Sequence, residues 1–530
     1  MQLRKSSLLV SLVLVLALAA TSAAGDPMGP AIVTLPDDEL GAPFWASIRL
    51  VEELEEPYVE EEFFLEGTAT VYNYASLPPV RGEIVPIASQ TELPYKTRFV
   101  VRRPADPADF NGTVVIEWMN STSGFDVATV WDTSAGYFAR EGIVYVGWTN
   151  STQVLPFLYD GCRPVSFLPA TCGTRYASLL LSDNGQAYEI GSQLATLLRN
   201  PETSPLSEGY TVERIFHSGQ SQQGGSIVTY ASAFHLPGVN DGYFVQTAGV
   251  ARAINGGVAC TAAEAPPFPD CTPVLEGEQR LVRTDLPVPV YRAQTETDVA
   301  LLGVLTGDTR QEDTDTFRYY ELAGSAHTPV HEVELFGIAI PLSSFCAEQL
   351  NSMADGPVFS AYLVNAMWEN LERQVADGVP PPRGEPIKSV GDVIARDAFG
   401  NALGGVRLPE LDVPVATYGP SASVSPDLSP IIPANLANLF CRLTGTTIPF
   451  DPALLEFLYP TRADFVEPYV AATEALVETR FLLPEDAAKL VARAVPEPGA
   501  GLLGAAAVAA LAAVRRRPGV RPLDRRCSRC

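Results

Sequence analysis

The sequence predicts an α/β fold in which a mostly parallel central sheet carries helices on both faces. Through the first half of the chain, short apolar segments of strand character alternate with segments whose apolar residues recur at helical spacing. Residues 213–235 indicate a strand, a tight turn and a helix in direct succession. Strands separated by helices form parallel sheets, because the helix returns the chain to the edge where the strand began.

The individual elements follow from apolar content and spacing. Segment 112–118 is apolar along most of its length, as expected for a strand buried on both faces. Segment 188–198 repeats apolar residues at Ile190, Leu194 and Leu198, which is helical spacing. The expected strands are 97–102, 112–118, 143–147, 214–217, 288–292 and 317–322, and the expected helices are 130–140, 188–198 and one that follows the turn at 219–225.

The C-terminal part, residues 351–494, is predicted to be a helical and irregular extension packed on a core of about 55–350. An amphipathic helix at 358–375 is followed by three consecutive prolines, which end it. Helices are also expected at 469–481 and 485–493, whereas 406–418 is predicted to be extended and interrupted by prolines. We expect this extension to pack on the core and to wall the pocket, and it shows no chemistry of its own.

A serine occupies the apex of the strand-turn-helix segment. Ser221 follows Gly219 and precedes the pair Gly224-Gly225, so glycines bracket the turn. A serine on a strained turn of this kind projects its Oγ into a cleft, and the N–H groups at the start of the helix can stabilise an oxyanion. The arrangement is typical of a nucleophile elbow.

The match to the elbow pattern G-x-S-x-G is incomplete. Gln223 stands where a second glycine normally lets helix and strand approach closely, and Gly224 and Gly225 offer that room one residue later. The alternative interpretation is an ordinary β-turn-α unit with a surface serine. Partner residues elsewhere in the chain must decide between the two.

The acid partner is sought after the next suitable strand. In α/β hydrolases, which use such an elbow, the acid and then the histidine follow the serine along the chain. Strand 288–292 leads into a loop with Glu296 and Asp298, on the edge of the sheet where the elbow lies. Asp298 is favoured, because its place resembles the usual acid-bearing loop of that fold, in which a proline and a strand are followed by a short loop that ends in the Asp. Glu296 stays open as the alternative acid.

Histidine is scarce, which narrows the choice of base. His217 lies within the elbow strand and is expected to be a hydrogen-bonded core residue, and His235 ends the following helix, where a cation suits the dipole. His327 lies three residues after a glycine, in the loop beyond strand 317–322, and is predicted to be the base. His327 and His331 could also form an H-x-x-x-H metal pair, but no further ligands are evident, and no metal is expected.

The oxyanion of an acyl-transfer reaction needs donors already in place, and a single donor contributes roughly 2.7–4 kcal/mol. One donor is expected to be the backbone N–H of Gln222, at the start of the elbow helix. The second is expected from the loop after Trp118, where Asn120 or Met119 offers an N–H. Asn120 fits equally well as a plain turn former.

The two ends of the chain carry targeting signals. Residues 1–24 combine Arg4 and Lys5, an apolar run and small residues, which predicts a secretory signal peptide. Residues 495–530 contain Val-Pro-Glu-Pro, an apolar run and three arginines, and resemble the PEP-CTERM sorting signal of certain Gram-negative bacteria. That resemblance implies processing by an exosortase, transient membrane association and a final location at the cell surface or in the extracellular matrix. A simple C-terminal anchor is the alternative.

The mature segment, residues 25–494, is strongly acidic. The chain has a net charge of −26, and because the two terminal segments carry +2 and +5, the remainder carries −33. So negative a field disfavours nucleic acid and anionic membrane surfaces as partners. Segment 52–66 contributes eight of these charges and is predicted to be a solvated edge, with metal binding as the less favoured alternative.

Six of the cysteines lie within the mature segment. An even number in an exported protein predicts disulfides, and many pairings are possible. The neighbouring pairs Cys162–Cys172 and Cys260–Cys271 are favoured because each would brace a proline-rich loop, which leaves Cys346–Cys441.

Several segments together resemble the poorly characterised alpha/beta hydrolase domain family, and the similarity covers most of residues 55–494. The resemblance implies an α/β-hydrolase fold with Ser221 as nucleophile, and it carries no settled substrate. No cofactor is expected from the sequence. The main motifs of the resemblance are EEFFLEG at 61–67, FNGTVVIEWMN at 110–120, GQSQ at 219–222, QTETD at 294–298 and ELAGSAH at 321–327.

Two functional classes follow from the sequence. The first is an exported serine hydrolase that cleaves carboxylic esters of small or polymeric substrates through a Ser-Asp-His triad and an acyl-enzyme. The second is a surface or biofilm-matrix protein that uses the same scaffold for binding, without catalysis. Reaction of Ser221 with a fluorophosphonate separates the two.

Overall fold

The computed structural model describes residues 31–47, 49–76, 79–163, 170–206, 208–261, 271–304, 309–328, 346–348, 359–427 and 434–494. The predicted signal peptide, the predicted sorting signal and His331 lie outside these residues. No helix within them is both long and apolar enough to cross a membrane.

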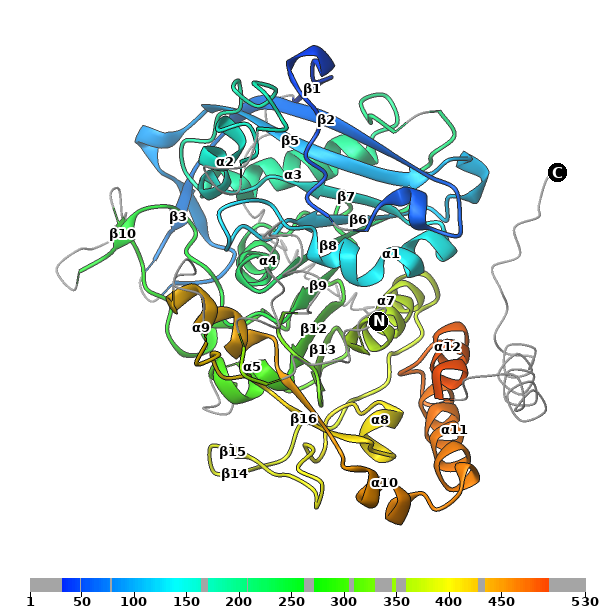
Figure 1. The fold of residues 1–530 in the computed structure, drawn as a ribbon. Coiled ribbons are helices and arrows are strands. Elements are labelled where there is room, and N and C mark those ends of the chain that lie inside the picture. The colour runs from blue at the N-terminus through cyan, green and yellow to red at the C-terminus, as the bar shows by residue number, and fades with distance from the viewer. Residues whose placement is uncertain are drawn as a thin grey trace, which may run out of the picture.

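A nine-stranded sheet forms the centre of the described part of the chain (Figure 1). The first three pairings are antiparallel and the five that follow are parallel, so the fold is α/β with a mostly parallel sheet, as predicted. In spatial order the strands are β1 (Ile32–Thr34), β2 (Tyr58–Ala69), β5 (Leu93–Pro104), β7 (Val144–Trp148), β6 (Thr113–Trp118), β8 (Arg214–Gln220), β9 (Gly242–Gln246), β12 (Val290–Thr295) and β13 (Phe317–Leu322).

Helices cover both faces of this sheet, and each face has its own apolar cluster. Side chains alternate along a strand, so Val115 packs in one cluster and Val114 in the other. Helices α1 (Thr129–Glu141) and α7 (Phe359–Asp377) pack on the first face, where Trp368 contacts aromatic rings of both α1 and the sheet. Helices α3 (Gln186–Arg199) and α4 (Gln222–Ala233) pack on the second. The parallel strands are therefore apolar on both sides.

Most expected elements agree with the structure to within a few residues, and the C-terminal extension holds the exceptions. Segment 406–418 is not extended throughout, because Pro409 starts the short helix α8 (Pro409–Asp412) before β16 (Ala416–Gly419) begins. The predicted helix 469–481 starts earlier, at α11 (Arg462–Glu478), where Thr461 and Asp464 form a capping box.

The remaining elements are short and lie outside the central sheet. They are α2 (Leu155–Tyr159), α5 (Glu296–Leu301), α9 (Ala434–Leu443), α10 (Pro452–Leu458), α12 (Pro484–Ala494), and the strand pairs β3 (Tyr72–Tyr74) with β4 (Ile84–Pro86), β10 (Val258–Ala259) with β11 (Cys271–Thr272), β14 (Ser389–Val390) with β15 (Val393–Ile394), and β16 with β17 (Thr446–Pro449).

The acidic segment 52–66 is only partly a solvated edge. Its second half forms β2, which pairs with the arginine-rich strand β5. Glu62 is buried and accepts from Arg98 at 2.5 Å and from Arg175 at 2.7 Å. The expectation of a solvated edge is therefore wrong for this half, because charge pairing across the two strands makes burial of a carboxylate tolerable.

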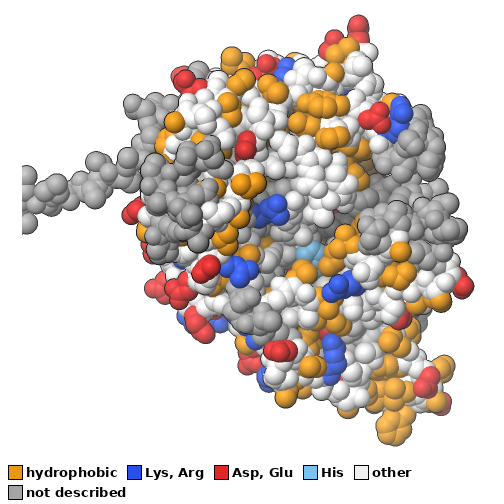
Figure 2. Space-filling model, turned by 90° about the vertical axis from the view of Figure 1, so that its left-hand side faces the viewer, with side chains coloured by type: hydrophobic (Ala, Val, Ile, Leu, Met, Phe, Trp, Pro, Cys, Tyr) orange, Lys and Arg blue, Asp and Glu red, His pale blue; other side chains and the backbone are white. Residues whose placement is uncertain are grey.

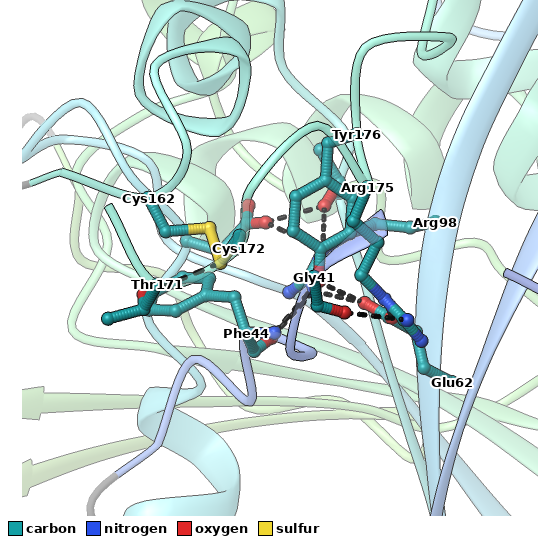
Figure 3. Close-up of a disulfide and its surroundings, with 11 residues drawn as sticks. Gly41, Phe44, Glu62, Arg98, Cys162, Thr171, Cys172, Arg175 and Tyr176 are labelled. Atoms are coloured by element: carbon teal, nitrogen blue, oxygen red, sulfur yellow. Dashed lines mark hydrogen bonds and ion pairs between the residues drawn. A yellow bond between two sulfur atoms is a disulfide. The ribbon is translucent and has the colours of Figure 1, made fainter. Parts of the chain in front are cut away.

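The structure contains the three disulfides that the sequence favoured: Cys162–Cys172, Cys260–Cys271 and Cys346–Cys441. Figure 3 shows the first of them beside the ion-pair cluster of Glu62, Arg98 and Arg175. Because Arg175 follows Cys172 closely, the disulfide fixes the loop that carries one of the guanidinium groups.

Candidate active site

The strand-to-helix turn at Ser221 has the strained geometry of a nucleophile elbow. Ser221 lies between β8 and α4 with φ of 55° and ψ of −115°, a backbone conformation that a non-glycine residue rarely adopts. Its N–H donates to the Gln246 carbonyl at 3.0 Å, which ties the turn to the neighbouring strand β9. An ordinary surface turn has no need of such strain, so the geometry favours the elbow interpretation.

Two glycines allow the helix to pack closely on the strand. A Cβ on Gly219 would lie 2.8 Å from the Gln223 backbone, and a Cβ on Gly224 would lie 2.6 Å from the Ala248 Cβ. Neither position can hold a side chain without displacement of the backbone. The elbow pattern has a glycine at residue 223, which leaves space for the close approach of helix and strand. Here Gly224 provides that space, as the sequence suggested.

The side chains of three distant residues meet at the carboxyl edge of the sheet. His327 Nε2 lies 2.9 Å from Ser221 Oγ, and His327 Nδ1 lies 2.6 Å from Asp298 Oδ1. They follow β8, β12 and β13, whose parallel directions bring the loops after them to one edge. Asp298 and His327 are buried, with 1% and 4% of their surface exposed.

The second oxygen of Asp298 is also fixed. Asp298 Oδ2 accepts from both the N–H and the hydroxyl of Thr295, each at 2.7 Å, as part of a capping box that starts α5. The carboxylate therefore cannot rotate freely, and its Oδ1 stays directed at the imidazole.

Glu296, the alternative acid, has different partners. Its Oε1 accepts from Arg396 at 2.8 Å and its Oε2 accepts from the Gly324 N–H at 2.7 Å. Burial raises the pKa of Glu296, although Arg396 opposes that shift. Glu296 thus anchors the loop that carries His327 to the C-terminal extension, and it does not contact the imidazole.

The other described histidines are structural. His217 is fully buried, accepts from Trp118 Nε1 at 3.3 Å and lies 3.0 Å from Asn240, and burial lowers its pKa to about 3. His235 differs from the expectation of a helix-end cation, because burial and the nearby Arg283 lower its pKa. Among the described residues, no group of three His, Cys, Asp or Glu side chains is placed to hold a metal.

The backbone donors expected in the oxyanion loop, residues 119–128, are not available. The Asn120 N–H donates to the Val127 carbonyl at 2.9 Å, and the Met119 N–H donates to the Trp148 carbonyl at 3.4 Å. Asn120 Oδ1 accepts from the Thr122 N–H at 2.8 Å, so Asn120 has the turn-forming role that the sequence left open.

Ser121 is the residue that the sequence reasoning missed. Neither its N–H nor that of Gln222 has a hydrogen-bond partner among the described residues. The Ser121 hydroxyl donates to Gln222 Oε1 at 2.8 Å, which holds this loop against the start of α4. Only one residue, Met119, separates the end of β6 from the turn at Asn120. In the sequence, the only signal for Ser121 was therefore its place directly after that turn.

Ser221 and His327 line an open pocket, in which the empty space, including the open solvent at its mouth, amounts to about 470 Å³. One wall is polar and comes from the oxyanion loop and the start of α1, with Thr122, Ser123 and Thr129. The other wall is apolar and comes from α9, where Leu439 stays 43% exposed. Figure 2 shows one hollowed face of the molecule, with a histidine side chain in the hollow and apolar side chains beside it.

The apolar wall belongs to the C-terminal extension. The Leu443 carbonyl at the end of α9 accepts from the Thr328 N–H at 2.9 Å, next to His327. The disulfide Cys346–Cys441 ties the same helix to a distant part of the chain. The extension therefore walls the pocket through α9, as expected.

Glu117, at the end of β6, links the sheet to the oxyanion loop. It accepts from the Val130 N–H at 3.0 Å, the Trp131 N–H at 3.1 Å and the Tyr145 hydroxyl at 2.7 Å. The first two donors belong to the first turn of α1, so the carboxylate caps that helix and fixes where the oxyanion loop ends. Burial raises the pKa of Glu117 to about 7, although these hydrogen bonds act to lower it.

This shift predicts a pH-dependent contribution to stability. Since the pKa rises from 4.5 in the unfolded chain to about 7, the folded protein binds this proton more tightly, and the free energy of unfolding falls as pH rises between those values. We expect the Glu117→Gln variant to lack that decline, which amounts to roughly 3 kcal/mol at most. Urea unfolding of both proteins from pH 5 to pH 8 checks the difference in slope. Parallel profiles would contradict it.

Comparison with known proteins identifies the family. The family model described as alpha/beta hydrolase domain matches residues 28–492. The chain belongs to this family. None of the curated proteins compared with this α/β hydrolase is significantly similar to it.

Solved structures of low sequence identity also resemble this α/β hydrolase. A glucuronoyl esterase from Teredinibacter turnerae is 12% identical over 60% of this chain and 78% of its own, with a TM-score of 0.29. A glucuronoyl esterase from Solibacter usitatus is 11% identical over 56% and 81%, with a TM-score of 0.28. A dienelactone hydrolase from Anabaena variabilis is 12% identical over 46% and 89%, with a TM-score of 0.25.

Proposed function

We propose that this α/β hydrolase is an exported serine esterase, with Ser221 as nucleophile, His327 as general base and Asp298 as the acid that orients the histidine. The observation that carries the proposal is the continuous hydrogen-bond chain from Ser221 Oγ through both imidazole nitrogens to Asp298 Oδ1. A hydroxyl is a weak nucleophile unless a base accepts its proton during attack.

The reaction proceeds in two half-reactions. Ser221 Oγ attacks the ester carbonyl while His327 Nε2 takes the hydroxyl proton, and a tetrahedral oxyanion forms. The oxyanion collapses to an acyl-enzyme as His327 gives the proton to the departing alcohol. A water molecule then attacks the acyl carbon, again through His327, and releases the carboxylic acid and free Ser221.

The oxyanion is stabilised by the backbone amide of Gln222. This amide lies at the N-terminus of α4, where the helix dipole favours negative charge. It has no hydrogen-bond partner among the described residues. Preorganised donors of this kind contribute because they need no rearrangement during the reaction.

The pocket favours a neutral ester. Apart from His327, its lining residues in the described part of the chain carry no ionisable side chain. The threonine and serine hydroxyls of one wall suit a polar alcohol group, and the leucines and phenylalanine of α9 suit an apolar one. Three disulfides agree with an extracellular location, and the terminal signals support export with processing by an exosortase.

Labelling of the purified segment 25–494 tests the proposal. A fluorophosphonate is expected to react covalently with one residue, and peptide mass spectrometry should locate the adduct at Ser221. A panel of p-nitrophenyl esters should be hydrolysed, with short neutral acyl groups ahead of charged ones. If the protein is not labelled and hydrolyses none of these esters, the non-catalytic binding scaffold is favoured instead.

A further inference from the structure

Glutamine side chains flank the nucleophile on both sides. Gln220 precedes Ser221, and Gln222 and Gln223 follow it. Gln220 and Gln223 are buried, and a buried primary amide is costly unless it is hydrogen bonded. All three side chains bond to residues 120–121, at the start of the oxyanion loop.

The Ser121 hydroxyl links two of these glutamines. Gln223 Nε2 donates to Ser121 Oγ at 3.1 Å, and Ser121 Oγ donates to Gln222 Oε1 at 2.8 Å. Ser121 is fully buried, so its hydroxyl has no competing water. The hydroxyl is therefore fixed from two sides, and the Ser121 backbone is fixed with it.

Gln220 connects the oxyanion loop to the histidine loop. Its Oε1 accepts from Asn120 Nδ2 at 2.9 Å, and its Nε2 donates to the His327 carbonyl at 3.1 Å. A single side-chain amide thus joins the oxyanion loop to the segment that carries the base, directly beside the nucleophile.

The oxyanion loop needs this support because it has little regular structure. It forms a single isolated bridge, between Asn120 and Val127, and otherwise turns between β6 and α1. Catalytic groups must be held to within about 0.5 Å of their productive positions. The glutamine side chains add tethers at residues 120–121, where the loop lies against the start of α4.

We propose that Gln220 and Gln223 are positioning residues that hold the oxyanion loop and the loop of His327 against the start of α4, where the Gln222 amide faces the oxyanion. This inference rests on the proposed serine esterase function. It also explains why a glutamine stands at residue 223, where the elbow pattern has glycine: Gly224 provides the close packing, and the Gln223 side chain reaches the oxyanion loop. Such tethers act on the transition state and not on ground-state binding.

Methionine substitutions test the proposal. Gln223→Met keeps the length of the side chain and removes its donor, and we expect kcat for p-nitrophenyl acetate to fall about 10- to 100-fold with KM changed less than about 3-fold. The affinity for a trifluoromethyl ketone, which forms the tetrahedral oxyanion, should fall by the same factor as kcat/KM. Ser121→Ala, which removes the linking hydroxyl and keeps the amide, should act in the same direction.

Gln193→Met is the matched control. Gln193 is an equally buried amide on α3, and it donates to the Thr68 carbonyl at 2.8 Å, away from the pocket residues. This variant should lose stability and keep kcat within about 2-fold of wild type. Thermal unfolding of all variants reports whether each is folded at the assay temperature.

The outcomes are separable. Three results for Gln223→Met would overturn the positioning role alone. These are an unchanged kcat, an effect on KM without one on kcat, and a fall in kcat that Gln193→Met equals. A wild-type protein that neither hydrolyses esters nor reacts with a fluorophosphonate overturns this role together with the proposed function.

Discussion

Replacement of Ser221 by alanine is expected to lower kcat for p-nitrophenyl acetate by roughly 10⁵–10⁶-fold. The change removes the only atom that can form the acyl-enzyme, and His327 then has no hydroxyl proton to accept. Residual turnover should remain above the rate in water, because the amide of Gln222 still binds an oxyanion formed by water attack. Steady-state kinetics with active-site titration of the wild type measures the ratio.

Ser226 provides the matched control for this variant. It is a buried serine in the same helix, α4, so Ser226→Ala repeats the chemical change away from the pocket residues. Its kcat should stay close to that of wild type, and fluorophosphonate labelling should persist. Substantial hydrolysis by the Ser221→Ala protein would refute the proposed nucleophile.

The second large effect concerns the acid. We expect Asp298→Asn to lower kcat by about 10⁴-fold, because an amide cannot hold a proton on His327 Nδ1 or stabilise the imidazolium that forms during attack. The carboxamide keeps the shape of the side chain, so KM should change little. Measurements of kcat and KM at saturating ester separate these effects.

The Glu296→Gln variant tests the choice between the two candidate acids, Asp298 and Glu296. Glu296 pairs with Arg396, whose side chain is partly exposed, and bonds to the loop before His327. Its loss should lower the free energy of unfolding by about 1–3 kcal/mol and lower kcat less than 10-fold. If Glu296→Gln were the more damaging variant for kcat, the assignment of Asp298 would be wrong.

The sequence by itself determined the fold class and the positions of the main elements, because apolar periodicity reports which residues are buried on each face. It also singled out Ser221, Asp298 and His327, since parallel strands bring the loops at their carboxyl ends to a shared edge whatever the details of packing. Local signals and topological rules were sufficient for these predictions.

Only the tertiary structure decided which groups are free and which are engaged. The amides of Asn120 and Met119 are already bonded, whereas that of Gln222 has no partner within the described part of the chain. For Asn120 this depends on the register of one short bridge. Glu62 is buried because it faces arginines from distant segments, not because of its neighbours in sequence. Hydrogen-bond partners and burial of polar groups arise from contacts across the fold, which periodicity does not encode.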